Sequence, residues 1–352
     1  MRQTLLFFIL LCGHSFLVSA QTSDTTAIKP GQSPFQMLSQ YDSLEVWLEM
    51  DVKKIRREQK PEVWHPATFK IRKGNSTLRE FAVTVQPRGN NRRETCDMPP
   101  LKIRFPQNRA LPDSLQETYT LKMVAPCKLG ANLEALVLKE CLLYELYGLL
   151  TPESFKTKLA SLTLKDRNKK SANQPVFCFF IETAAELADR LHWKAIKPTV
   201  MSPKGLDTAA FNRVCVFQYM IGNTDWTPYN RHNIRIFISK KNNAVISVPY
   251  DFDYAGAVDA PYAIPQAGAP IESVRQRYFF GLCYPAAKYQ QTFDLFLAQK
   301  AAILKRCDDF PYLPKNARYD LKTFIASFFP VIENPKLAKR QILEHCDNFK
   351  KE

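Results

Sequence analysis

Acidic and amide side chains gather at the ends of two neighbouring strands that the sequence predicts. The stretch NTDWTPYNRHN contains Asp225, Asn230 and Asn233, and Asn233 directly precedes the alternating apolar run IRIF. Asp251 and Asp253 lie in YDFD, at the end of the next apolar run. If the turn SKKNNA joins the two runs as a hairpin, the end that carries Asn233 meets the end that carries Asp251. The sequence therefore predicts that these side chains converge on one site.

Residues of these types can carry out phosphoryl transfer from a nucleotide. That reaction needs one Asp to orient the attacking hydroxyl, an Asn and a second Asp to bind Mg²⁺, and a Lys, fixed by a helix Glu, to hold the phosphates. Asn230 lies five residues after Asp225, as in protein kinases, whereas Asn233 lies eight residues after it and leads a strand. Both asparagines stay candidates for the metal-binding residue. Since Asp and Asn also stabilise ordinary turns, the prediction depends on the whole set.

A strand-rich segment upstream must position the lysine. Alternating apolar runs predict strands at residues 43–50, 67–73, 80–87, 100–105, 118–124, 155–166 and 175–183. The apolar run NLEALVLKECLLYELYGLL predicts one long helix over residues 132–150, with Glu140 on its apolar stripe. Lys122 lies on the strand directly before this helix, and Lys102 lies on the strand before that one.

The second half of the chain is mostly helical in pattern. Apolar spacing predicts helices over residues 209–222, 289–307, 319–329 and 335–346, interrupted by the predicted hairpin. This organisation indicates an α+β fold of two lobes, joined near residues 182–188. The strand-rich N-lobe is expected over residues 41–183, and the helical C-lobe, which carries the hairpin, over residues 184–352.

The start of the chain has the pattern of a signal peptide. Residues 1–20 combine Arg2, an apolar stretch too short to span a membrane comfortably, and the small-residue sequence Val18-Ser19-Ala20. Residues 21–40 are polar and predict a flexible lead-in. No later stretch is long and apolar enough for a transmembrane segment. The sequence thus predicts an exported protein of the periplasm, the cell surface or the medium.

Composition and cysteines narrow the class further. Hydrophobic residues make up 45% of the 352 residues and the formal net charge is +15, so the chain is globular and basic. Nucleic acid is not favoured as a partner, because aromatic residues cannot be assigned to the same face as the basic runs. No two cysteines form a CxxC pair, which argues against zinc. Cys141, Cys178 and Cys215 lie in apolar runs and are expected to be buried, with one or two disulfides among the others.

With these residues in view, the chain over residues 45–285 resembles the CotH family of spore-coat-type atypical protein kinases and, more distantly, HipA-like kinases. The shared features are an Arg-Gly-Asn turn, a helix ending in Gly-Leu before a Pro, a strand ending in Glu, a Gly-Asn-x-Asp sequence, an Asn that leads a strand, and a WD-x-D element. In this chain they are Arg88-Gly89-Asn90, Gly148-Leu149 with Pro152, Glu182, Gly222-Asn223-Thr224-Asp225, Asn233 and YDFD.

The resemblance implies a two-lobed protein-kinase-like fold that transfers phosphate from ATP to a protein or peptide acceptor. It implies that Asp225 is the catalytic base. It also implies that Asp251 and either Asn233 or Asn230 bind Mg²⁺ or Mn²⁺, with Asp253 as a further ligand.

The nucleotide would be held by residues of the strand-rich half, again as the resemblance implies. Glu182 would mark the hinge beside the adenine. Lys122 would bind the phosphates with Glu140 as its partner, and Lys102 is the rival lysine. Arg88 belongs to the turn that faces the nucleotide.

Two departures from the family pattern favour alternative functions. NRRETCDMPP follows the Arg-Gly-Asn turn in place of a Ser- and Lys-rich stretch, although Arg92 and Arg93 could still meet phosphates. The spacing from Asp225 to Asn233 is about three residues longer than the kinase spacing. The alternatives are a pseudokinase that keeps the fold without turnover, and a cell-envelope or adhesion protein that binds anionic polymer and needs no metal site.

Overall fold

The computed structural model describes residues 28–29, 31–58, 60, 62–89, 96, 99–106, 119–128, 131–198, 201–346 and 348–349. The predicted signal peptide, residues 1–20, lies outside these residues, as do Asn90, Arg92 and Arg93 of the predicted nucleotide loop. Within the described part, the helices are all too short or too polar to cross a bilayer.

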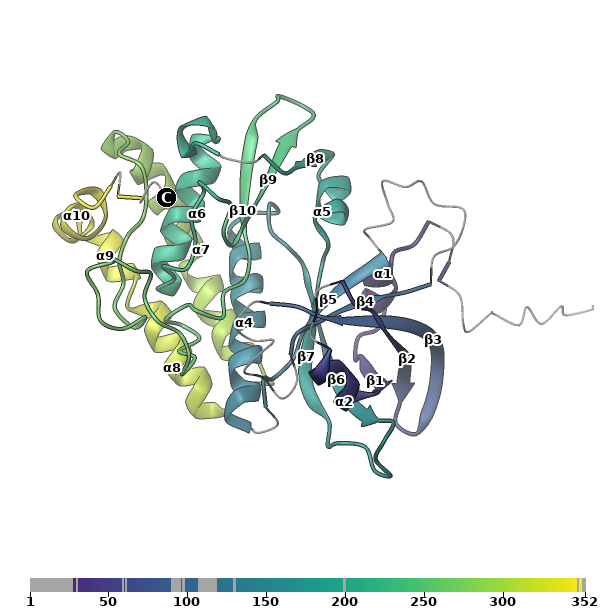
Figure 1. The fold of residues 1–352 in the computed structure, drawn as a ribbon. Helices are drawn as coiled ribbons and strands as arrows, with labels where there is room; N and C mark the ends of the chain where they lie inside the picture. Colours follow the sequence, from purple (N-terminus) through teal and green to yellow (C-terminus); the bar gives the residue numbers. More distant parts are fainter. Residues whose placement is uncertain are drawn as a thin grey trace, which may run out of the picture.

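Seven strands of the described chain close into a barrel in the order β1-β2-β3-β4-β5-β7-β6 (Figure 1). They are β1 (Glu45–Met50), β2 (His65–Lys73), β3 (Ser76–Pro87), β4 (Leu101–Arg104), β5 (Thr120–Val124), β6 (Thr157–Asp166) and β7 (Val176–Ile181). Neighbours pair antiparallel except β1 and β6, which run parallel with Val46 opposite Leu162. Every predicted strand of this region is confirmed. Their alternation points one side chain in two into the barrel, where apolar residues such as Leu48, Phe69 and Ile103 are fully buried.

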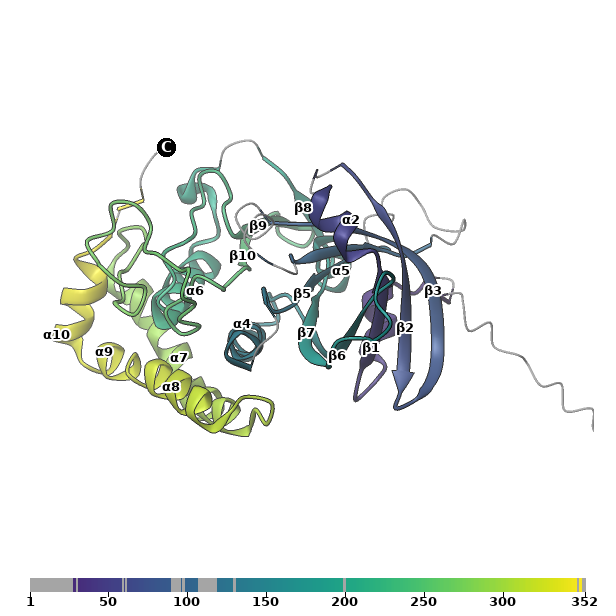
Figure 2. The same ribbon diagram turned by 60° about the horizontal axis from the view of Figure 1, so that its bottom comes forward.

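The long helix α4 (Ala131–Leu150) lies between the barrel and the other large helices in both views (Figures 1 and 2). It packs against β7 of the barrel and against α7 (Ala286–Asp309) on its other side. Because both sides are covered, its sequence is apolar nearly all round, as for a buried helix. The predicted helix over residues 132–150 is thus confirmed.

The remaining elements form the mostly helical second half, as predicted, which we call the helical part. It contains α5 (Ala184–Arg190), a 3-10 turn (Pro203–Gly205), α6 (Thr208–Ile221), α7, α8 (Lys315–Ala326), α9 (Phe329–Glu333), α10 (Pro335–Ala338) and a π-helical turn (Lys339–Leu343). A small sheet joins β8 (Trp193–Ile196), β9 (Ile234–Ser239) and β10 (Val245–Pro249) in the order β10-β9-β8. Antiparallel pairing of β9 and β10 confirms the predicted hairpin.

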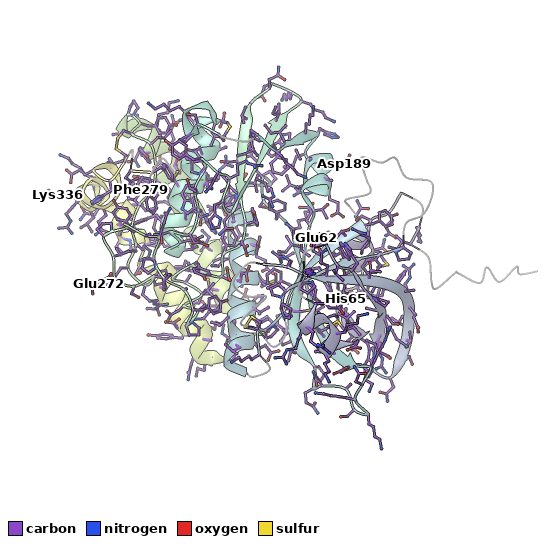
Figure 3. The ribbon with its side chains drawn as sticks, viewed as in Figure 1. Glu62, His65, Asp189, Glu272, Phe279 and Lys336 are labelled. Carbon is purple, nitrogen blue, oxygen red and sulfur yellow. A yellow bond between two sulfur atoms is a disulfide. The ribbon has the colours of Figure 1, made fainter. Side chains whose placement is uncertain are left out.

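Apolar side chains of the described residues bury themselves in two clusters. One fills the barrel, and the other joins α4, the helical part and the small sheet. Figure 3 shows His65 on the barrel and Phe279 and Lys336 among the helices. The chain is therefore a mixed fold in which a strand-rich half and a mostly helical half each have a core.

The predicted flexible lead-in over residues 21–40 is wrong for its second half. Helix α1 (Pro34–Ser39) begins there, with Ser33 and Gln36 forming a capping box. Phe35 and its neighbours Met37 and Leu38 are buried. The Ser33 hydroxyl also hydrogen-bonds Glu186 of α5. The segment is polar on average, but its few apolar residues lie on one face of a short helix and are buried there. A second short helix, α2 (Val52–Arg57), follows β1 and is capped by Asp51.

Two disulfides join described cysteines, Cys96–Cys127 and Cys283–Cys346. The free cysteines of the described chain are all buried, namely Cys141, Cys178, Cys215 and Cys307. The expectation of one or two bridges is therefore confirmed, as is the burial of three of these thiols.

The segment after β10 has little regular structure but is fastened to the helical part. The backbone N–H of Gly256 donates to the carbonyl of Gly222 at 3.0 Å. Arg275 donates to the carbonyl of Gly256 at 3.0 Å and forms an ion pair with Asp320 of α8 at 2.8 Å. Lys139 of α4 also reaches Asp320, at 2.9 Å. The residues that follow Asp251 are thus held between α4, α6 and α8.

Gly256→Ala is expected to destabilise the fold by about 3 kcal/mol, because the new methyl group cannot be accommodated without moving backbone. A Cβ at this position would lie 2.0 Å from the carbonyl oxygen of Val274. Gly148→Ala is the matched control, since its Cβ would meet nothing closer than the Ser154 hydroxyl at 3.5 Å. That helical substitution is expected to be neutral or to stabilise by roughly 0.5–1 kcal/mol. Urea unfolding of both variants measures the difference, and equal effects would contradict the crowding at Gly256.

Candidate active site

The loop between α6 and β9 orients Asp225. Gly222 ends α6 in the left-handed conformation, with φ 67°. The Asn223 side chain then links the helix to the loop: its Nδ2 donates to Gln218 Oε1 at 3.1 Å, and its Oδ1 accepts from the Asp225 N–H at 3.0 Å. Asn223 is 1% exposed, so this link is shielded from water. The Gly-Asn-x-Asp sequence therefore fixes the backbone that carries Asp225.

Both oxygens of the Asp225 carboxylate are held by neighbours. Asn233 Nδ2 donates to Oδ2 at 2.9 Å and to the Asp225 carbonyl at 2.7 Å. His232 Nε2 lies 2.9 Å from Oδ1, and since an ionised carboxylate only accepts, the imidazole is the donor. Asn233 has φ 54°, a left-handed conformation that Asn tolerates. The contact of His232 with Asp225 was missed, because its sequence signal is only a polar residue in a turn.

The second acidic pair lies at the end of β10, as the hairpin prediction requires. The Tyr250 N–H donates to the Asn233 carbonyl at 3.0 Å, which joins the two strand ends. The Asp251 N–H donates to the Tyr144 hydroxyl of α4 at 2.8 Å. Asp253 is buried, and its Oδ2 accepts from the Tyr262 hydroxyl at 3.2 Å.

These groups line one cavity of about 520 Å³ between the helical part and the barrel. Its acidic wall contains Asp225, Asn233, Asp251 and Asp253 together with His232. The lining also includes Arg88, Gly89 and Pro100, which lie next to β3 and β4 of the barrel. The structure thus brings together the acids that the sequence predicts to converge.

Asn230 lies outside the residues that line this cavity. Its side-chain Oδ1 accepts from the His232 N–H at 3.0 Å, and its side chain is exposed. Of the two candidate metal-binding asparagines, the structure places Asn233 at the cavity and Asn230 in the supporting turn.

Basic residues gather on the barrel side. Lys122 of β5 lies opposite Lys102 of β4 in the sheet. The pKa of Lys122 falls from 10.5 to about 7, chiefly through burial and then through the charges of Arg88 and Arg235, against the opposing charge of Asp251. Burial, with Arg88, also lowers the pKa of Lys102.

The ammonium group of Lys122 has no hydrogen bond or ion pair within the described residues. Its Nζ lies 5.2 Å from the centre of the Tyr250 ring, which offers only a cation–π contact. A cation that is desolvated, crowded by other cations and weakly compensated is suited to an anionic ligand.

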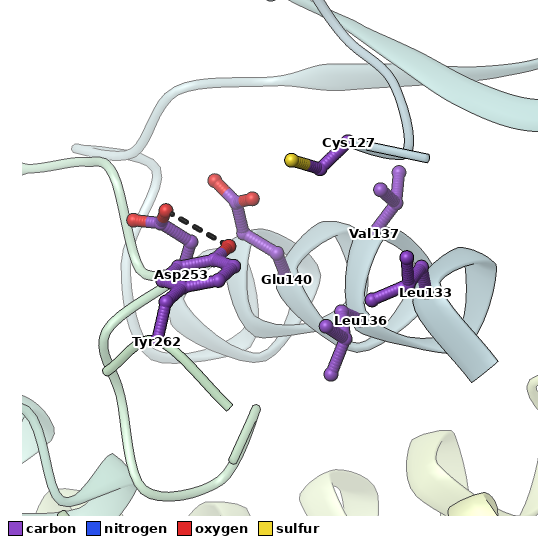
Figure 4. A pocket seen from close by; sticks show the side chains of 7 residues that line it. All are labelled: Cys127, Leu133, Leu136, Val137, Glu140, Asp253 and Tyr262. Carbon is purple, nitrogen blue, oxygen red and sulfur yellow. Dashed lines mark hydrogen bonds between the residues drawn. The ribbon is translucent and has the colours of Figure 1, made fainter. Parts of the chain in front are cut away.

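Glu140, the predicted partner of Lys122, points into a small pocket beside Asp253 and Tyr262 (Figure 4). The acidic group that favours the charged form of Lys122 is Asp251. Cys127, of the Cys96–Cys127 disulfide, lines the same small pocket. The pairing of Lys122 with Glu140 stays a prediction, whereas Asp251 is the observed acidic neighbour of the lysine.

Glu182 lies between β7 and α5, where the chain leaves the barrel. Its carboxylate is 4% exposed and accepts from Arg190 at 2.9 Å through each oxygen. The Lys156 N–H donates to the same carboxylate at 3.0 Å. Arg190 also donates to the carbonyls of Pro152 and Ser154. The side chain of Glu182 therefore ties the connection together, and the predicted contact of this position with adenine stays a prediction.

Arg190→Met is expected to destabilise the protein by about 3 kcal/mol, because it leaves the buried Glu182 carboxylate without its cation. The double variant Glu182→Gln/Arg190→Met is expected to recover part of that loss. Lys305→Ala, which breaks the exposed pair with Asp309, serves as the control and should change stability by less than about 0.5 kcal/mol. Chemical denaturation gives all three values, and a small effect of Arg190→Met would show that the pair is solvated.

The donor set of the cavity suits a hard divalent cation that also binds a ligand. The carboxylates of Asp251 and Asp253 and the side-chain amide oxygen of Asn233 are oxygen donors of the kind that Mg²⁺ or Mn²⁺ prefers. Among the described residues, no three His, Cys, Asp or Glu side chains are grouped to hold a metal ion by themselves.

Comparisons with known proteins add little to this geometry. No family model matches the sequence, and no curated protein matches it. Among solved structures, the chain is similar to the crystal structure of a Helicobacter pylori proinflammatory kinase, CtkA, over 70% of this chain and 91% of that one. The identity is 10% and the TM-score is 0.36.

Proposed function

We propose that this protein is an exported phosphotransferase with a two-lobed, kinase-like fold, which transfers phosphate from Mg-ATP to a protein or peptide acceptor. One observation carries the proposal: Asp225, Asn233 and Asp251 meet at a single cavity that Arg88 also lines. The two disulfides support export, because such bonds persist in oxidising compartments.

Each residue has a role that follows from its place. Asp225, held by His232 and Asn233, receives the proton of the acceptor hydroxyl. Asp251 and Asn233 would hold the divalent cation, which would supply positive charge beside the phosphates. Lys122 and Arg88 bind the phosphates from the barrel side. The negative charge of the phosphates compensates the buried ammonium group of Lys122.

Thermal unfolding with and without Mg-ATP tests the proposal, together with transfer of labelled phosphate to a mixed pool of proteins. A ligand present at about 100 times its dissociation constant adds roughly 2.7 kcal/mol of stability, so a clear rise in melting temperature is expected. Mg²⁺ alone serves as the control. A shift without transfer favours the pseudokinase, and the absence of a shift favours a surface-binding protein that needs no metal.

A further inference from the structure

Two aromatic side chains of the loop over residues 223–233, which also carries Asp225 and Asn233, pack into the hydrophobic core. Trp226 is 1% exposed, and Tyr229 packs against the same core. Both rings contact Phe349, with ring centres 5.2 Å and 6.5 Å apart. The end of the described chain thus lies against the loop of the candidate active site.

Packing alone fixes the Trp226 ring. Its indole Nε1 is buried and makes no hydrogen bond within the described residues. Its ring neighbours are Phe349 and, at 6.1 Å, Phe211 of α6. Since Asp225 directly precedes Trp226, a shift of the indole moves the backbone that carries the carboxylate. Hydrogen bonds cannot compensate for a lost ring contact at this position.

Three independent contacts at the end of the described chain hold Phe349 in place. They are made by Cys346, Asn348 and Phe349 itself, and we call these three residues the tail clamp. Cys346 is bonded to Cys283. Asn348 Nδ2 donates to the Phe279 carbonyl at 2.6 Å, and its Oδ1 accepts from the Gly281 N–H at 3.4 Å. The Phe349 ring stacks on Phe280, with centres 5.7 Å apart. The clamp fastens the tail to residues 279–283, near the Phe279 labelled in Figure 3.

We propose that Phe349 is a positioning residue for the catalytic loop, held in place by the Cys283–Cys346 disulfide. The inference rests on the proposed function for its effect on catalysis, although the packing of the loop does not depend on that function. Phe349 is not among the residues that line the cavity, and it acts through Trp226 and Tyr229.

Hydrogen exchange of the full-length protein, measured by mass spectrometry on the peptide that covers residues 223–233, tests the positioning. Phe349→Ala is expected to raise exchange in this peptide about tenfold, because the loop loses its packing. Phe329→Ala is the matched control: it removes a fully buried ring that contacts the Phe328 ring and the Lys300 ammonium group, both outside residues 223–233. If Phe349→Ala does not fold, the double variant Cys283→Ser/Cys346→Ser replaces it.

Transfer kinetics give the second readout. Phe349→Ala is expected to lower kcat by roughly 10- to 100-fold while the KM for nucleotide stays within about threefold, because misplacement of Asp225 affects the reaction more than binding. Phe349→Tyr should restore most of the rate, since it keeps the flat ring.

Two results would overturn the inference: unchanged exchange in residues 223–233, or an equal rise with Phe329→Ala. If the unaltered chain transfers no phosphate, the proposed function fails, while the exchange measurement still decides the role of Phe349.

Discussion

Asp225→Asn is expected to lose at least about a hundredfold of the phosphoryl-transfer rate while its affinity for Mg-ATP stays within roughly threefold of the unaltered chain. The amide keeps the size of the carboxylate, and its single oxygen can still accept from one of the two donors, His232 or Asn233, that hold Asp225 at 2.9 Å each. It cannot accept a proton from the acceptor hydroxyl. The substitution therefore separates the reaction from nucleotide binding.

The measurements are single-turnover transfer and titration calorimetry with Mg-ATP. Asp189→Asn is the matched control, because Asp189 is exposed on α5 and lies away from the cavity lining (Figure 3). This control should leave both quantities unchanged. A variant Asp225→Asn that no longer binds Mg-ATP would show that Asp225 holds the cation, and an unchanged transfer rate would show that it is not the base.

The sequence predicts those parts of the site that depend on local pattern. Period-two runs identify the strands, and a short polar turn identifies the β9–β10 hairpin, so the meeting of Asn233 with the Asp251 end follows from neighbouring segments. The Gly-Asn-x-Asp sequence is also a local signal, because the side chain of Asn223 accepts a hydrogen bond from Asp225, only two residues further along the chain.

The parts that the sequence does not predict depend on distant contacts. The barrel closes through parallel pairing of β1 with β6, and most of the barrel sequence separates these two strands. The alternation of apolar residues predicts each strand but not the strand with which it pairs. The neighbour of Lys122 proves to be Asp251, because the hairpin end of the helical part faces β5. The Cys283–Cys346 disulfide is one of the contacts that hold Phe349 against the loop, and sequence alone does not reveal disulfide connectivity.

Lys122 is expected to lower the stability of the ligand-free fold and to strengthen the binding of an anion. The pKa of Lys122 falls from 10.5 to about 7 on folding, chiefly through burial and then through Arg88 and Arg235. A base with a lowered pKa in the folded state destabilises that state whenever it is protonated. Lys122→Met is therefore expected to stabilise the ligand-free protein by roughly 2–4 kcal/mol near neutral pH, since it removes the buried charge.

The pH dependence has a defined sign. Below pH 7 both states carry the Lys122 proton and the full destabilisation is present, whereas between pH 7 and pH 10.5 the unfolded state binds more protons, so the stability of the unaltered chain rises with pH. The advantage of Lys122→Met should accordingly shrink as pH rises through this window. Urea unfolding of both chains over this range measures the trend. The exposed Lys194 of β8 supplies the control variant Lys194→Met, which should show no such trend.

Binding should change in the opposite direction to stability. Lys122→Met is expected to weaken binding of ATP and of inorganic tripolyphosphate by roughly 10- to 100-fold, because it removes a charge-assisted contact to phosphate. Binding to the unaltered chain should take up protons between pH 7 and pH 10.5, since a bound polyanion raises the pKa of Lys122 above its ligand-free value of about 7. Calorimetry in buffers of different ionisation enthalpy measures this uptake. If Lys122→Met is more stable and still binds polyphosphate, the anion binds elsewhere. If Lys122→Met is more stable and no longer binds polyphosphate, Lys122 lowers the stability of the fold and serves to bind the anion.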